Sequence, residues 1–170
     1  PSPASFGEDP ITVNIVGVTP STKNLSRLPL NGVNDFVRFD ASASVEEALL
    51  FNGPITMEAW IYPQDLNNKQ TILHKQNSFR MYLNGSTLET RLYLNGNFRA
   101  FSSPATVNVN QWSHVLTTYN PGVDNLVKTY INGQIVSSTS YSASTFTQEG
   151  ITEDFEIGGR IPVNTPPQYD

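Results

Sequence analysis

The stretch ITMEAWIYP at residues 55–63 decides the fold of this chain. It is rich in β-branched and aromatic residues, which favour strands, and it closes at Pro63, which cannot continue a hydrogen-bonded ladder. Because side chains alternate across a strand, the residues divide into two faces. One face carries Met57, Ala59 and Ile61, and the other carries Glu58, Trp60 and Tyr62. The pattern predicts a strand and leaves open which of the two faces meets the core.

Similar short runs lie on both sides of this stretch, at roughly the 8–12-residue spacing of sandwich and barrel proteins. They cover residues 11–18, 33–39, 71–74, 79–83, 90–94, 98–101, 112–119, 127–131, 134–136 and 155–157. Asn-Gly follows Tyr-Leu or Tyr-Ile at 84–85, 95–96 and 132–133, and this dipeptide favours tight hairpin turns. One helical turn is expected, at 41–50. The sequence therefore predicts an all-β, antiparallel fold.

Composition limits the possible partners. The 170 residues fit one domain, only 15% of them are charged, and the net charge is −5. The ten basic residues are scattered, so no basic stripe is present to bind nucleic acid or an anionic membrane. No cysteine is present, and no apolar run reaches the roughly 20 residues of a membrane helix. We expect neither nucleic-acid binding nor membrane insertion.

Five segments occur in the order of a known family: NGVNDFVRF (31–39), ITMEAWIYP (55–63), QWSHVLTTY (111–119), YINGQIV (130–136) and FEIGGR (155–160). Together they resemble the laminin-G-like and concanavalin A-like lectin/glucanase superfamily, which includes the pentraxins. The resemblance implies an antiparallel jelly-roll β-sandwich over residues 30–170. Residues 1–29 are interpreted as a lead-in that contains the strand predicted at 11–18.

The chain departs from this family after the Gly-Gly turn. Members usually continue into one more strand, whereas here the sequence ends at Asp170. We expect the closing C-terminal strand to be missing from this stretch or to come from a partner segment. Residues 11–18 either take its place or form the last strand of a preceding module. An unpaired strand edge favours association with another chain.

Catalysis is not expected. Glycosidases of this fold carry paired carboxylates on one strand, and here only Asp154 and Glu156 share a face, with Glu153 on the other. The family's catalytic pattern of three alternating acids is absent. His74 and His114 are the two histidines, and no Gly-x-Ser-x-Gly elbow accompanies them. The sequence predicts no enzyme, with a hydrolase as the weakest alternative.

A polar and aromatic face is the candidate ligand site. If residues 79–83, 90–94 and 98–101 form consecutive strands with their apolar residues inward, six other side chains share the opposite face. They are Arg80, Tyr82, Arg91, Tyr93, Arg99 and Phe101. Aromatic rings stack on sugars, and guanidinium groups donate hydrogen bonds to hydroxyls and carboxylates. The alternative is an ordinary solvated face with common cross-strand neighbours.

Two further expectations follow from the resemblance. Many relatives bind one Ca²⁺ between the opening loop and the C-terminal strand, which makes Asp35 a candidate ligand. The alternative for Asp35 is a turn residue that accepts backbone hydrogen bonds. Trp60 and Trp112 lie in family-type strands, where core packing is the expected role.

The leading hypothesis is a non-catalytic carbohydrate-recognition or adhesion module of a larger secreted or cell-surface protein. Its partner would be a glycan or a cell-surface protein. The composition, which is rich in Asn, Thr and Ser and lacks cysteine, resembles that of bacterial surface proteins, so we expect an extracellular or cell-surface location. The alternative is a structural or protein-interaction module recognised by secretion machinery or by a neighbouring domain.

Overall fold

The computed structural model describes residues 13–16, 27–40, 49–50, 52–146 and 154–159. These residues form strands, turns and loops, with no helix among them. The helical turn expected at 41–50 lies almost wholly outside the described residues. The strands are β1 (Val13–Val16), β2 (Phe36–Phe39), β3 (Ile55–Ile61), β4 (Lys69–Lys75), β5 (Phe79–Asn84), β6 (Thr87–Leu94), β7 (Asn97–Thr106), β8 (Ser113–Tyr119), β9 (Leu126–Ile131), β10 (Gln134–Ser140) and β11 (Phe155–Ile157).

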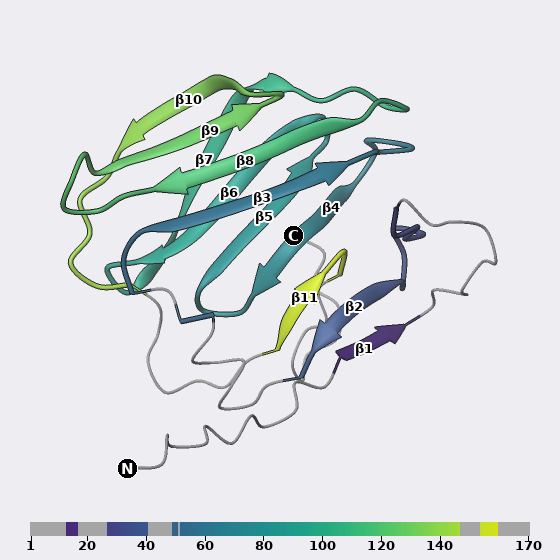
Figure 1. Cartoon of the computed structure of the whole chain (residues 1–170), viewed down its shortest axis with the longest axis horizontal. Helices are drawn as coiled ribbons and strands as arrows, with labels where there is room; N and C mark the ends of the chain where they lie inside the picture. The colour runs from purple at the N-terminus through teal and green to yellow at the C-terminus, as the bar shows by residue number, and fades with distance from the viewer. Residues whose placement is uncertain (1–12, 17–26, 41–48, 51, 147–153, 160–170) are drawn as a thin grey trace, which may run out of the picture.

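Two antiparallel sheets stack face to face (Figure 1). The larger sheet has the order β1-β2-β11-β4-β5-β6-β7, and the smaller has the order β10-β9-β8-β3. The smaller sheet covers the β4–β7 part of the larger one, while β11, β2 and β1 extend beyond β3. This arrangement confirms the predicted all-β jelly-roll sandwich.

The core lies between the two sheets. Its composition shows which face of β3 points inward, a point that the sequence pattern left open. Met57 is buried, and Ala59 and Ile61 pack against the same cluster, so this face of β3 points inward. From the larger sheet the cluster takes Met81, Leu83, Leu88, Leu92 and Leu94, and from the smaller sheet it takes Val115, Tyr119 and Val127. Burying such side chains stabilises a fold by roughly 1.5–3 kcal/mol each.

Hairpin turns occur where Asn-Gly predicts them, with one shift. Asn95 and Gly96 have φ of 51° and 77°, and Asn132 and Gly133 have the same values, as a type I′ turn requires. In the third hairpin Asn84 is still part of β5 and pairs with Thr87, so the turn falls on the next two residues. Gly85 supplies the positive φ at the first turn position.

One polar contact crosses the core. The hydroxyls of Thr90 on β6 and Thr117 on β8 lie 2.8 Å apart, and both residues are fully buried. In the folded protein the two hydroxyls bond to each other instead of to water. Removing one of them therefore leaves the other without a hydrogen bond. We expect Thr117→Val to cost about 1–3 kcal/mol of unfolding free energy. The double variant Thr90→Val/Thr117→Val should recover most of that loss, as measured by urea denaturation. A double variant less stable than Thr117→Val alone would contradict this account.

The first and last described strands lie on either side of β2 in the larger sheet. β1, which lies within the strand predicted at 11–18, pairs with β2 at the sheet edge. β11 is inserted between β2 and β4 and pairs with both. Its Glu156 is buried and lies 3.0 Å from Arg38 of β2 and 3.2 Å from His74 of β4. A three-residue strand is therefore held by side chains on both of its neighbours.

Candidate functional site

Four of the six predicted ligand residues share the outer face of the larger sheet. Arg80 and Arg91 are direct cross-strand partners, and Tyr82 and Tyr93 lie on the same side of β5 and β6. The intervening residues of these strands, including Met81 and Leu92, point into the core. Strand alternation therefore fixes this part of the face as the sequence predicts.

The prediction is wrong for β7. Arg99 pairs with Leu92 and Phe101 pairs with Thr90, so both belong to the inward side of the sheet. Phe101 is buried, and its ring lies 6.1 Å from that of Tyr141. The outer face instead receives Phe98, which pairs with Tyr93. The physical reason is the two-residue Asn95–Gly96 turn, which places residues equidistant from it on the same face.

A buried carboxylate organises one half of this face. Glu89 accepts hydrogen bonds from the Tyr82 hydroxyl, from Nε of Arg91 at 2.9 Å and from Oγ of Ser102 at 3.4 Å. The guanidinium of Arg91 also lies 5.5 Å from the centre of the Tyr82 ring. Glu89 therefore orients Arg91, a role that the sequence pattern did not reveal because its three partners come from three different strands.

Aromatic rings organise the other half. The Arg80 guanidinium lies 4.8 Å from the centre of the Phe98 ring and donates to Oε1 of Gln76 at 3.0 Å. The Phe98 ring meets Tyr93 edge to face at 5.3 Å. We call the whole surface the arginine face; it comprises Arg80, Tyr82, Glu89, Arg91, Tyr93, Phe98 and Ser102. It offers oriented guanidinium donors beside aromatic rings.

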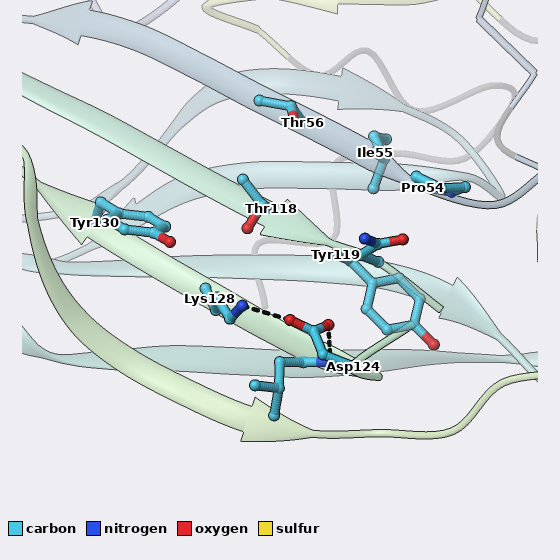
Figure 2. Close-up of a pocket in the computed structure, with 10 residues that line it drawn as sticks. Pro54, Ile55, Thr56, Thr118, Tyr119, Asp124, Lys128 and Tyr130 are labelled. Atoms are coloured by element: carbon cyan, nitrogen blue, oxygen red, sulfur yellow. Dashed lines mark hydrogen bonds and ion pairs between the residues drawn. The ribbon is translucent and has the colours of Figure 1, made fainter. Parts of the chain in front are cut away.

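The outer face of the smaller sheet carries a groove. Figure 2 shows Thr56 of β3, Thr118 of β8 and Tyr130 of β9 around a groove of about 290 Å³. Lys128 donates to the carboxylate of Asp124 at one side of this groove. This hydrogen bond lowers the pKa of Asp124 and raises the pKa of Lys128. The groove thus combines hydroxyls with one neutralised ion pair.

Both tryptophans lie outside the core, contrary to the sequence expectation. Trp60 is 67% exposed and Trp112 is 46% exposed. They lie on the outer side of β3 and just before β8, respectively. The strand pattern allowed this result, because Trp60 alternates with Met57, Ala59 and Ile61, which fill the core instead.

A family model described as the concanavalin A-like lectin/glucanases superfamily matches residues 31–167. The chain belongs to this superfamily. Among curated proteins no significant match is found.

Three solved structures illustrate the likeness of this superfamily member to known folds. The CBM40 of Ruminococcus gnavus IT-sialidase, bound to α2,3-sialyllactose, aligns with a TM-score of 0.52 at 16% identity over 64% of this chain and 65% of that chain. Botulinum neurotoxin type C, whose cell entry depends on two ganglioside molecules, gives 0.53 at 14% over 78% and 33%. The binding domain of botulinum neurotoxin DC, in complex with rat synaptotagmin II, gives 0.52 at 15% over 87% and 37%.

The ligands and activities of these three proteins cannot be assigned to this chain from the likeness of fold. The chain spans less than two thirds of the length of each, and about one third of the toxin chains. At such low identity the likeness shows the fold alone.

The two carboxylates considered for hydrolysis, Asp154 and Glu156, take part in ion pairs with a neighbouring strand. Asp154 lies 3.3 Å from Nε of Arg38, and Glu156 lies 3.0 Å from another nitrogen of the same guanidinium. His114 lies 3.3 Å from the Glu58 carboxylate on the outer face of the smaller sheet. The described residues therefore place both carboxylates in ion pairs with one arginine.

Asp35 lies in a turn organised by Asn31. Its Oδ2 accepts the Asn31 backbone N–H at 3.1 Å, while the Asn31 side chain accepts the N–H groups of Val33, Asn34 and Asp35. Within the described part of the chain, no group of three or more His, Asp or Glu side chains gathers where it could hold a metal ion. Calcium binding at Asp35 stays a prediction. The described residues likewise contain no helix that could span a membrane.

Proposed function

We propose that this chain is a non-catalytic carbohydrate-recognition module of a larger secreted or cell-surface protein, and that the arginine face holds the glycan. The observation that carries the proposal is the cross-strand pair Arg80–Arg91, flanked by aromatic rings. The sialyllactose bound to the CBM40 and the gangliosides of the toxin support it by analogy of fold.

The chemistry of the face fits a sugar. Guanidinium N–H groups donate to hydroxyl and carboxylate oxygens, and Glu89 fixes the direction of Arg91. The exposed parts of Tyr93 and Phe98 offer ring surface to the C–H side of a pyranose. Because the orienting contacts exist within the sheet itself, little side-chain ordering is left to be done on binding.

The lack of catalysis is part of the same proposal. A catalytic carboxylate must reach the substrate to donate or accept a proton. Asp154 and Glu156 instead contact the Arg38 guanidinium within the larger sheet. A pair of carboxylates held in this way supports structure rather than hydrolysis.

Two arginine variants separate the proposed site from its surroundings. We expect Arg91→Ala to weaken glycan binding by roughly tenfold or more, because it removes the oriented donor. Arg99→Ala makes the same change of charge on the inward side of the sheet and should leave binding within about twofold. A glycan array followed by calorimetry with the best ligand measures both. Equal binding by the wild type and both variants would refute this site.

The alternative of a protein-interaction module has support from one relative, the toxin domain bound to synaptotagmin. It predicts a protein partner whose binding Arg91→Ala also weakens, with no signal on the glycan array. From the superfamily resemblance we also propose that Asp35 is a ligand of a bound Ca²⁺.

A further inference from the structure

Four aromatic rings form a strip on the outer face of the smaller sheet, on the opposite side of the sandwich from the arginine face; Trp60 and Trp112 are exposed, and Tyr62 and His114 are half-buried. Trp60 lies beside His114 with ring centres 5.1 Å apart, and Tyr62 lies beside Trp112 at 5.5 Å. Trp60 and His114 are partners in the β3–β8 ladder, and Tyr62 and Trp112 follow just beyond its last pair, Ile61–Ser113. Glu58 lies next to the first pair and Arg27 next to the second. We call these six residues the tryptophan strip.

The fold does not need these rings. The opposite side of β3 already fills the core through Met57, Ala59 and Ile61. Single exposed apolar residues are common on soluble proteins, but contiguous ones mark interaction sites. Four rings in adjoining cross-strand pairs are contiguous, so the strip requires an explanation by binding.

We propose that the tryptophan strip binds a neutral oligosaccharide chain, as a second site independent of the arginine face. One side of a pyranose ring presents C–H bonds, which carry partial positive charge and lie favourably against the negative face of an aromatic ring. Two successive ring pairs provide platforms for successive sugars. Glu58 and Arg27 carry opposite charges at the two ends, so the strip has no net charge to attract an anionic ligand.

The polar groups of the strip favour a sugar over a protein surface. The Glu58–His114 pair lies directly beside the Trp60 ring, and the Glu58 side chain is 64% exposed. A dry protein interface would strip water from this pair, and the cores of such interfaces are depleted in charge. A sugar leaves the pair hydrated and supplies hydroxyls that donate to the carboxylate.

The groove of Figure 2 continues the same face beyond Glu58. Thr56 lies two residues before Glu58 on β3, and its side chain shares the outward direction of Glu58 and Trp60. With Thr118 and Tyr130 it adds hydroxyls along the path of an extended ligand. A chain of several sugars, rather than one, fits a surface built in this way.

Intrinsic fluorescence tests this proposal directly, because the two tryptophans of the chain both lie in the strip. We expect neutral gluco-, xylo- and manno-hexaoses, titrated in turn, to include one that changes the emission saturably. Calorimetry with that sugar should show binding weakened roughly tenfold or more by Trp60→Ala and by Trp112→Ala. Trp60→Phe, which keeps a ring, should lose less. Circular dichroism confirms that each variant is folded.

Ile135→Ala is the matched control, since it removes another exposed apolar side chain from the same sheet face and should leave affinity unchanged. Arg91→Ala should also leave the fluorescence titration unchanged. Sugar binding lost in Arg91→Ala but retained in Trp60→Ala would overturn the strip and keep the proposed function. Emission that responds to protein concentration and to none of the sugars would overturn the strip in favour of self-association.

Discussion

Glu156→Gln should lower the unfolding free energy by about 3 kcal/mol, as measured by urea denaturation at pH 7. The buried Glu156 carboxylate lies against Arg38 and His74, so its loss leaves the Arg38 charge only partly compensated. Breaking a buried pair from one side typically costs 3–5 kcal/mol. We expect the lower end of that range because Asp154 still lies 3.3 Å from the Arg38 guanidinium.

Glu58→Gln is the control for this change. Its carboxylate also contacts a histidine, His114, but from an exposed position on the smaller sheet. Exposed pairs contribute little, so its effect should stay within about 0.5 kcal/mol. The double variant Arg38→Met/Glu156→Gln should lose less than the sum of the single variants. Equal effects of Glu156→Gln and Glu58→Gln would show that the buried pair does not hold β11.

Gly158→Ala is the second change with a large expected effect. It should lower the unfolding free energy by about 2–5 kcal/mol. Gly158 follows β11 with a φ of +77°, a conformation that costs an alanine roughly 1–2 kcal/mol. Its added Cβ would also lie 2.0 Å from Cδ1 of Leu30, so that side chain must move. Overpacking of this kind typically costs 1–3 kcal/mol. Thermal and urea denaturation measure the combined loss.

Gly96→Ala isolates the backbone part of that cost. Gly96 has the same φ of +77°, and nothing lies within 4 Å of a Cβ added there. It should therefore lose only the conformational term, about 1–2 kcal/mol. In the background of Leu30→Ala, the loss caused by Gly158→Ala should shrink towards the Gly96→Ala value. An undiminished loss in that background would show that Leu30 is not the source of the strain.

The predicted ligand face shows where reasoning from apolar residues failed. The alternation of Phe98 and Ala100 with Arg99 and Phe101 favours Phe98 and Ala100 as the inward pair, because both are apolar, and so puts Arg99 and Phe101 on the wrong side. The Asn95–Gly96 turn carried better information, since a two-residue hairpin pairs Leu94 with Asn97 and Tyr93 with Phe98. The length of a hairpin turn determines which side chains of the next strand face the core, and it does so more reliably than the polarity of one aromatic residue.

Glu89 was missed for a different reason. It stands between Leu88 and Thr90, and nothing in its neighbours along the chain indicates that it is buried. Its partners Tyr82, Arg91 and Ser102 come from three strands. Such a network exists only after the strands have paired.

The sequence by itself determined the strands, the hairpin turns and the all-β class, because strand period and turn conformation are local properties of the backbone. Only the tertiary structure decided which side of β3 meets the core, because that depends on what the opposite sheet offers for packing. It also decided that Trp60 and Trp112 face outward, and that Glu156 meets Arg38 across 118 positions of chain. Contacts between distant segments are set by the stacking of the sheets, and local pattern carries no record of them.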